Sequence, residues 1–212
     1  PLTHRFGRAI TPTTMDHVSD KKTLIRPPRV HIIGITGIPE IVSGTNLGKT
    51  IVNASVQQGT PIQNDDVIVV TQKIVSKSEG KIVDVSTVEP SNNALQLAKQ
   101  TGRDARLVEL VLRESRSIVR VDHTRGILIT ETKHGFVCAN AGIDSSNVPG
   151  ENNVSLLPDH PDQSANSLRK DIIARTDVEK IAIVISDTFG RAWREGHVNF
   201  AIGTSGINPI KD

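Results

Sequence analysis

The sequence predicts an α+β fold with two lobes and mixed sheets, and two observations support this class. Strand-like and helix-like segments are mixed along the chain without the regular alternation of a doubly wound sheet. The 212-residue chain also has only four Phe, one Trp and no Tyr, so Val, Ile and Leu must supply most of the buried apolar surface. Branched aliphatic residues favour strands and helix–sheet layers. A chain of this length fits one domain or two small, closely packed lobes.

Apolar runs predict where the strands lie. The segments VHIIGI at 30–35, DDVIVVTQKIVSK at 65–77 and IAIVIS at 181–186 each predict a strand, and the last one delivers Asp187 at its carboxyl end. Residues 125–142 predict a hairpin that turns at His134-Gly135. Residues 1–29 are polar, basic and interrupted by prolines, so we expect an N-terminal extension before a domain at 30–212.

Capping residues mark the expected helices, because Ser, Thr, Asp and Asn side chains accept from the free N–H groups of a helix start. We expect four helices: from Asn46 to Gln58 with Thr45 or Asn46 as the cap, from Pro90-Ser91 onward, after Asp104, and through Ala174 with Asp162 or Ser164 as the cap.

Composition argues against several functional classes. The formal charge of +2 arises from 25 basic and 23 acidic residues that are scattered along the chain, which disfavours a nucleic-acid-binding role. The single cysteine, Cys138, excludes an intramolecular disulfide framework and fits a reducing compartment. No apolar run approaches the roughly 20 residues of a membrane span. We therefore expect a soluble cytoplasmic protein with neither nucleic-acid nor membrane partners.

The segment Gly44–Thr50 resembles a phosphate-binding P-loop but lacks its spacing. A P-loop has four residues between its first Gly and the Gly-Lys pair, whereas only three separate Gly44 from Gly48-Lys49. The preceding IPEIV contains a Pro and is a poor central strand. We interpret the segment as a turn followed by a helix start, and expect neither a P-loop nor a Rossmann fold.

Two Asp-bearing segments are candidates for a metal–phosphate site. In ISDTFGRAWR, Asp187 and the hydroxyl of Thr188 could hold a divalent cation, and Arg191 with Arg194 could clamp phosphoryl oxygens. A helix cap with surface arginines would give the same pattern. In GFVCANAGIDSSNV, small residues allow a close approach of a ligand, and four oxygen-bearing side chains follow from Asp144. Taken alone, an Asx turn explains this second segment better.

A lysine pair follows the strongest predicted strand. Lys73 and Lys77 would project from one face of a continuing strand and suit a polyanion, although a solvated strand end would look alike. The histidines, His134 among them, lack metal-ligand spacing and are interpreted either as structural or as residues that support a site without binding the metal. Together, the two Asp-bearing segments, the lysines and the arginines suggest metal-assisted phosphoryl transfer.

Residues from about 36 to 212 resemble the coenzyme F420-0:L-glutamate ligases, also called gamma-glutamyl ligases. The resemblance is carried by several long motifs in the correct order, namely TGIPEI, DDVIVVTQKIVSKSEG, TGRDARLVELVLRES, ETKHGFVCANAGIDSSNV, LLPDHPDQSA and ISDTFGRAWREGHVNFAIGTSGI. It implies that GTP phosphorylates the carboxylate of F420-0, and that the amine of L-glutamate then attacks the acyl phosphate to give an amide, GDP and phosphate.

The resemblance also implies roles for individual residues. Asp144 and Asp187 would bind one metal ion and Thr188 a second, with Mg²⁺ or Mn²⁺ as the metal and K⁺ as a monovalent cation. The implied nucleotide contacts are Thr36, Gly37, Ile38, Pro39, Thr71, Gln72, Lys77 and Asn147. We expect the catalytic residues to be Asp144, Asp187 and Arg191.

Family members are expected to be homodimers and to continue beyond the position of Asp212, in a region that contributes to the second metal site. We therefore expect residues 30–212 to form a ligase-like domain that lacks this C-terminal part. Two alternatives stay open. One is a related ligase that forms an amide on another acid, and the other is a GTP- and metal-binding subunit that is inactive without the further segment.

Overall fold

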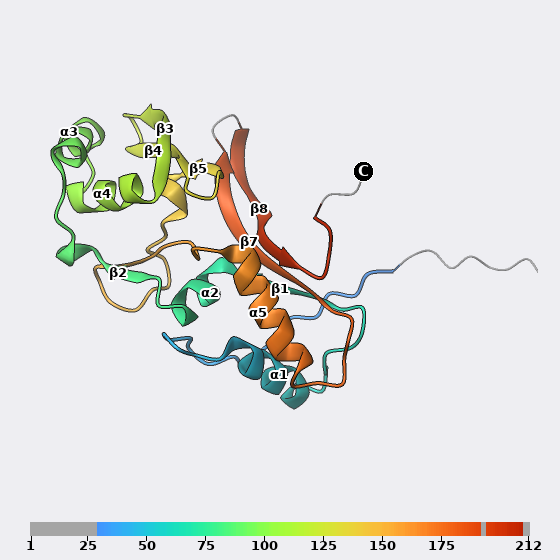
Figure 1. Ribbon diagram of the computed structural model, residues 1–212. Coiled ribbons are helices and arrows are strands. Elements are labelled where there is room, and N and C mark those ends of the chain that lie inside the picture. The colour runs from blue at the N-terminus through green and yellow to red at the C-terminus, as the bar shows by residue number, and fades with distance from the viewer. Residues whose placement is uncertain (1–28, 192–193, 210–212) are drawn as a thin grey trace, which may run out of the picture. The chain divides into compact units, whose positions relative to one another are not determined.

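A computed structural model of the chain describes residues 29–191 and 194–209. The chain divides into one unit at residues 1–34 and a second at residues 35–212. The second unit combines helices with sheets, one of which has both parallel and antiparallel pairs, so the predicted α+β class with mixed sheets is confirmed. Its elements form two lobes (Figure 1). Within the described residues, no helix combines the length and apolarity of a membrane span.

The first lobe is built on a three-stranded mixed sheet. Its strands lie in the order β1 (Val67–Thr71), β7 (Ala182–Arg191) and β8 (Arg194–Ser205). β1 runs parallel to β7, and β8 returns antiparallel to β7. Side chains alternate between the two faces, so Ile183 and Ile185 are fully buried on one face, whereas Val67 and Val69 are 51% and 64% exposed on the other.

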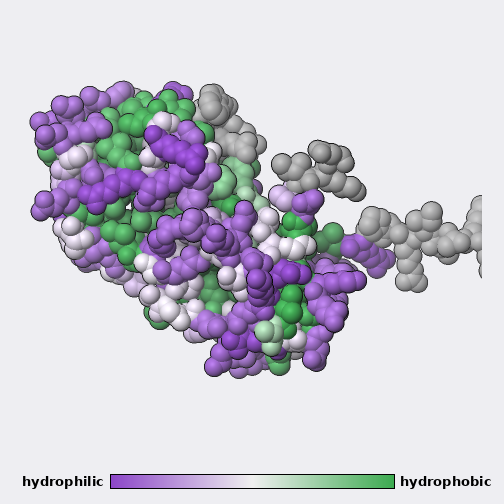
Figure 2. Space-filling model, in the orientation of Figure 1, coloured by the Kyte–Doolittle hydropathy of each residue, from purple (hydrophilic) through white to green (hydrophobic). Residues whose placement is uncertain are grey.

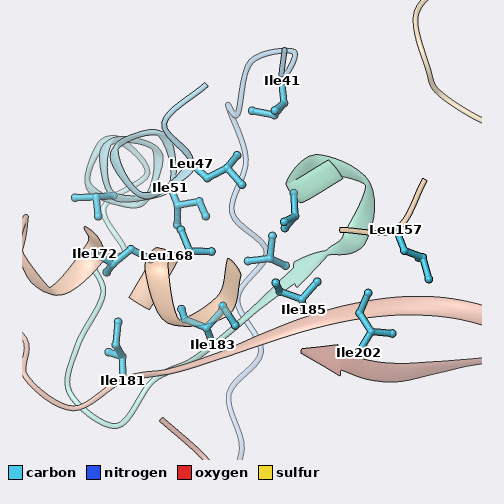
Figure 3. Packing of buried hydrophobic residues seen from close by; sticks show 14 of the residues in the cluster. Ile41, Leu47, Ile51, Leu157, Leu168, Ile172, Ile181, Ile183, Ile185 and Ile202 are labelled. Carbon is cyan, nitrogen blue, oxygen red and sulfur yellow. The ribbon is translucent and has the colours of Figure 1, made fainter. Parts of the chain in front are cut away.

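Two helices, α2 (Gln72–Ser78) and α5 (Pro161–Ile173), cover the buried face of this sheet, and α1 (Leu47–Gln57) packs against α5. The aliphatic side chains between the helices and the sheet form the main core (Figure 3). Isoleucine and leucine dominate it, as the composition predicts. The residues labelled in Figure 3 are Ile41, Leu47, Ile51, Leu157, Leu168, Ile172, Ile181, Ile183, Ile185 and Ile202.

The second lobe pairs two helices with an antiparallel sheet. The helices are α3 (Asn92–Thr101) and α4 (Ala105–Arg113). The sheet has the order β3 (Ser115–Asp122), β4 (Ile127–Thr132) and β5 (Val137–Ala139). A smaller core fills the space between them and consists of Ala94, Ala98, Val108, Val111, Leu128 and Ala141. The predicted 125–142 hairpin corresponds to β4 and β5 and is confirmed.

Short elements join the two lobes. β2 (Ile82–Asp84) pairs antiparallel with β6 (Asn153–Ser155), and the 3₁₀ helix Val85–Thr87 follows β2. A third cluster of buried residues packs here, formed by Val85, Val88, Leu110 and Val154. The second 3₁₀ helix, Asn140–Gly142, follows β5, which lies against β7. The loop after β5 therefore lies where the two lobes meet.

The surface is mostly polar. In the view of Figure 2, hydrophilic residues cover most of the molecule, and smaller hydrophobic areas lie between them. Scattered apolar residues of this kind are ordinary on soluble domains.

Three of the four predicted helix starts are confirmed. The side chains of Asn46, Ser91 and Asp104 accept from backbone N–H groups in the first turns of α1, α3 and α4. The cap predicted for α5 is wrong, because this helix begins directly at Pro161 after His160, which makes no side-chain cap. The Asp162 carboxylate instead accepts from the backbone N–H of Thr204 on β8, at 2.8 Å.

Three strand predictions need correction, and one strand was missed. Residues 30–35 form no strand, because they pair with no other strand of the described chain, and Ile32 is 94% exposed. The strand predicted at 65–77 ends at Thr71 and continues as α2. The strand predicted to end before Asp187 runs on to Arg191, because β8 pairs with it along its whole length. The strand β3 was not predicted, since its arginines interrupt the apolar alternation.

Glu109 links the two helices of the second lobe. Its carboxylate accepts from the backbone N–H of Ser91 at 3.0 Å, from Oγ of Ser91 at 2.6 Å and from Nε of Arg113 at 2.9 Å. The Glu109 side chain is only 11% exposed. These donors, with Ser91 the strongest, lower the pKa of Glu109 to about 2.

Glu109 is expected to make the fold sensitive to acid. Because its pKa is lower in the folded chain than in the unfolded chain, its contribution is complete above about pH 4.5 and is lost as the pH falls toward about 2. We expect Glu109→Gln to lower the free energy of unfolding at pH 7 by about 1–2 kcal/mol, since an amide oxygen cannot satisfy three donors. Urea unfolding at pH 7 and pH 3 tests this, with the exposed Glu151→Gln as the control. An equal loss at both pH values would contradict it.

Candidate functional site

The candidate site lies at the carboxyl end of the parallel strand pair. The register of β1 and β7 ends at the pair Thr71 and Ser186. Asp187 follows at once on β7, and Lys73 lies in the first turn of α2, which begins directly after β1. Ligands of α/β sheets bind preferentially at such carboxyl ends. Asp187 thus lies in the interior of β7, just beyond the point where the parallel strand β1 ends.

The Asp187 carboxylate is half-buried between the lobes. It accepts from the backbone N–H of Thr188 at 2.8 Å. Burial raises the pKa of Asp187, and the negative charge of Asp144 adds to the rise, while the Thr188 N–H and the Lys73 ammonium oppose it. The two aspartates that the sequence singled out are therefore close enough to interact electrically.

Asp144 belongs to the loop that follows β5. Its carboxylate accepts from the backbone N–H of Ser146 at 2.7 Å and from Oγ of Ser146 at 2.9 Å, which is the predicted Asx turn. The backbone of Asp144 also pairs with Ser155 beside β6. Burial alone would raise the pKa of Asp144, but Lys73 and the Ser146 donors together hold it below its usual value.

Lys73 completes the acidic site. Its ammonium lies 2.8 Å from Oδ2 of Asp144 and 2.7 Å from Oγ of Ser146. Sequence reasoning placed Lys73 on a strand beside Lys77 and missed this ion pair. A run of consecutive aliphatic residues cannot show that the strand ends at Thr71, so the direction of the Lys73 side chain was not predictable from it.

Left-handed backbone shapes the loop that carries Asp144. Asn140, Ala141, Gly142 and Asn147 all have positive φ. The small residues predicted to admit a ligand have another use here. Ala141 is 2% exposed within the second core, and a Cβ on Gly142 would lie 3.0 Å from Leu157. They allow close packing of the protein itself and thereby fix the path of the chain toward Asp144.

Cys138 is not a nucleophile of this site. The thiol is fully buried on β5. Burial first, and then the charge of Asp187, raise its pKa to about 12. The thiolate is therefore essentially unpopulated at neutral pH.

The predicted nucleotide-contacting residues lie in two groups. In the turn at 36–39, both the backbone N–H and the hydroxyl of Thr36 donate to Oε1 of Gln58 at 2.8 Å. Gly37 has a φ of +74°, Ile38 packs against the main core, and Pro39 is exposed. Directly after this turn, Glu40 accepts from Nζ of the buried Lys77 at 2.6 Å. Lys77 is thereby tied to the 36–39 turn.

The second group surrounds the end of β1. Thr71 is exposed, whereas Gln72 is only 2% exposed and donates to Oγ of Ser76 at 2.8 Å and to the carbonyl oxygen of Leu156 at 3.0 Å. The Gln72 amide nitrogen therefore bonds within the protein. Asn147 is exposed at the end of the Asx-turn loop.

Thr188 lies beside Asp187 in sequence but on the other face of β7. Its hydroxyl donates to Oδ1 of Asn199, which is its register partner on β8. Strand alternation thus separates the Thr188 hydroxyl from the Asp144–Asp187 pair. Asn199 could not be singled out from local sequence, because the register of β7 and β8 shifts twice along the hairpin.

Arg191 and Arg194 were predicted to belong to a loop near Asp187. They are instead the last residue of β7 and the first of β8, and they are register partners. Their side chains lie outside the described part of the structure.

The segment Gly44–Thr50 is a helix start, as expected. The backbone N–H of Lys49 donates to Oδ1 of Asn46 at 2.7 Å, and no strand precedes the turn in the described chain. The Asp171 carboxylate lies against Gly48, so that a Cβ there would come within 2.1 Å of Oδ2. A carboxylate at this position would repel a phosphate.

His134 has a structural position. Its Nε2 lies 2.8 Å from the carbonyl oxygen of Pro158 and 3.1 Å from that of Asp159, so this nitrogen carries the proton. The ring stacks on Phe136 at a centroid distance of 5.8 Å. These contacts of His134 are all with the protein itself.

The donor set fits a hard divalent cation. Asp144 and Asp187 offer two carboxylates, which suits Mg²⁺ or Mn²⁺ sites that take their other ligands from substrate phosphates and water. Within residues 29–191 and 194–209, no group of three or more His, Cys, Asp or Glu is arranged around one metal position. The described part of the chain would therefore supply a partial ligand set.

The fold and the site define an α+β protein with an acidic, oxygen-rich site at the end of a parallel strand pair. Residues 36–212 match the family model described as F420-0:gamma-glutamyl ligase. The chain belongs to this family of ligases, and the resemblance found in its motifs is confirmed.

Relatives support the assignment. The chain is 42% identical over 183 residues to the coenzyme F420:L-glutamate ligase of Methanothermobacter thermautotrophicus, which covers 86% of this chain and 71% of the relative. It is 43% identical over 152 residues to the protein of the same name from Methanocaldococcus jannaschii. This match covers 72% of the present chain and 59% of the relative. The coenzyme F420:L-glutamate ligase of Archaeoglobus fulgidus is 38% identical over 184 residues. This match covers 87% of the present chain and 70% of the relative. The matched stretch is thus less than two thirds of the M. jannaschii relative.

Proposed function

We propose that the chain ligates L-glutamate to the carboxylate of F420-0 in a GTP-dependent reaction that passes through an acyl phosphate. The observation that carries this proposal is the match of residues 36–212 to the F420-0:gamma-glutamyl ligase family. The names of the relatives support F420 and L-glutamate as substrates.

The proposed chemistry follows from the poor reactivity of a carboxylate. Its oxygen is a poor leaving group until phosphorylation by GTP converts the carboxylate to an acyl phosphate, which is a mixed anhydride. The amine of glutamate then forms the amide bond as the carbon–oxygen bond to phosphate breaks, and the amine loses a proton. The products are the amide, GDP and inorganic phosphate.

In this proposal Asp144 and Asp187 hold a divalent cation, Mg²⁺ or Mn²⁺. When bound, the cation would screen the negative charge of the triphosphate and of the incoming carboxylate. Lys73 adds a positive charge beside Oδ2 of Asp144. A second metal at Thr188 and a K⁺ ion remain proposals from the family resemblance, and the Thr188 hydroxyl faces away from the Asp pair.

The nucleotide is proposed to contact the 36–39 turn, Thr71, Gln72, Lys77 and Asn147, with Arg191 clamping phosphoryl oxygens. The pairing of buried Lys77 with Glu40 supports a common location for Lys77 and the turn. Because Gln72 is buried, we propose that it positions α2 and contributes its backbone rather than its amide nitrogen.

The decisive measurement is GDP release in the presence of Mn²⁺ or Mg²⁺. Release that requires both F420-0 and L-glutamate, with the glutamylated product found by mass spectrometry, is the expected result. Release that is indifferent to both would contradict the proposal. A screen of other acids in place of F420-0 tests whether the acceptor has been assigned correctly.

We also propose a homodimer, which the family resemblance implies. Light scattering after size-exclusion chromatography is expected to give twice the chain mass of 22.9 kDa. A mass of one chain at micromolar concentration would contradict this.

Lys49→Ala is expected to leave GTP affinity within about threefold of the wild type. Lys49 is exposed on α1, and the Asp171 carboxylate lies at the helix start where a P-loop would hold phosphate. Calorimetric titration with GTP and Mg²⁺ measures the effect. A loss of binding beyond tenfold would show that the segment does contact the nucleotide.

A further inference from the structure

Lys73 is the positive charge that the fold itself places in the acidic site. Its ammonium contacts Oδ2 of Asp144 at 2.8 Å and Oγ of Ser146 at 2.7 Å. The Lys73 side chain is 20% exposed, so water and salt screen this ion pair less than they screen a surface pair. The same charge also acts on Asp187. Lys73 is therefore the direct counter-ion of Asp144.

A divalent cation at Asp144 and Asp187 would compete with this ammonium. Oδ2 of Asp144, the acceptor for Lys73, is also an oxygen that a hard cation would use. Two positive charges a few ångström apart in a partly buried site repel each other strongly. Lys73 has a flexible four-carbon stem, so its ammonium can change partner while the backbone of α2 stays in place.

We propose that Lys73 exchanges its partner when the metal binds, leaving Asp144 for a phosphate or carboxylate oxygen of the anionic substrate. Metal and anion then favour each other's binding, because the anion stabilises the displaced ammonium and the metal frees it. Lys73 is in this sense a positioning residue that couples the two ligands. The inference rests on the proposed function, since it uses the metal site assigned there.

Manganese binding to the full chain tests the exchange, with free Mn²⁺ followed by electron paramagnetic resonance with and without GDP. Lys73→Met is expected to bind Mn²⁺ alone about tenfold more tightly than the wild type, because the competing charge is gone. The factor by which GDP tightens Mn²⁺ binding is expected to fall about tenfold in this variant. Lys73→Arg, which keeps the charge, should behave like the wild type.

Lys133→Met is the matched control, because it removes a lysine that pairs with Glu114 at 3.0 Å and not with the site. Lys133→Met should leave unchanged both the affinity for Mn²⁺ alone and the factor by which GDP tightens Mn²⁺ binding. Circular dichroism checks the fold of each variant, and Lys73→Gln replaces Lys73→Met if the latter is unfolded.

Two outcomes would overturn the inference in distinguishable ways. Equal Mn²⁺ affinity in the wild type and the neutral Lys73 variants, with binding lost in Asp187→Asn, would reject the exchange and leave the metal site in place. Mn²⁺ binding that is undetectable in every variant would reject the metal site and the exchange together.

Discussion

Asp187→Asn is expected to lower metal-dependent turnover by about a thousandfold or more. Asparagine keeps the shape of the side chain but removes one of the two negative charges proposed to hold the cation. Burial already disfavours the charged form of Asp187, since its pKa is raised in the fold, so a neutral amide should not destabilise the chain. The variant should therefore lose turnover and Mn²⁺ affinity, whereas its stability in urea unfolding should stay unchanged.

The control for this variant is Asp177→Asn, which neutralises an exposed aspartate in the turn after α5. It should leave turnover within about twofold. If Asp187→Asn kept wild-type turnover, Asp187 would be removed from the mechanism. If it unfolded the protein, the residue would be structural.

Gly203→Ala is expected to lower the free energy of unfolding by about 2–3 kcal/mol. Gly203 is buried on β8, where the chain passes directly against the start of α5. A Cβ would lie 2.5 Å from both the carbonyl carbon and the carbonyl oxygen of Pro161. Backbone atoms cannot rotate away as a side chain can, so α5 or β8 must shift. The shift would also strain the bond between Asp162 and the Thr204 N–H.

Gly34→Ala provides the comparison, because a Cβ there meets no atom within 4 Å and the position does not require a positive φ. Its effect should stay within about 0.5 kcal/mol. Urea denaturation of both variants gives the difference directly. A Gly203→Ala variant as stable as Gly34→Ala would show that the contact between β8 and α5 is looser than described.

The sequence was most informative where local chemistry decides structure. Asn46, Ser91 and Asp104 predicted helix starts because a side-chain cap acts within one turn. The start of α5 was mispredicted because Asp162 bonds to a strand 42 residues away. The formation of β3 and the length of β7 also depend on pairing with distant strands. A local sequence pattern does not show which strands will pair.

The site was predictable in part for the same reason. Asp144 and Asp187 could be singled out by residue type and by the family resemblance. The ion pair of Lys73 with Asp144 depends on where β1 ends, and the separation of Thr188 from Asp187 depends on the pleat of β7. Both are facts of tertiary structure.

The three charged groups of the site come from distant parts of the chain, since Lys73 and Asp144 are 71 positions apart and Asp144 and Asp187 are 43 positions apart. Bringing them together closes two long loops, which is entropically costly and slow compared with the formation of single helices. We therefore expect the site to assemble only when both lobes have docked through β5 and β7. If the chain binds Mn²⁺ as proposed, recovery of Mn²⁺ binding during refolding should lag behind recovery of helical circular dichroism.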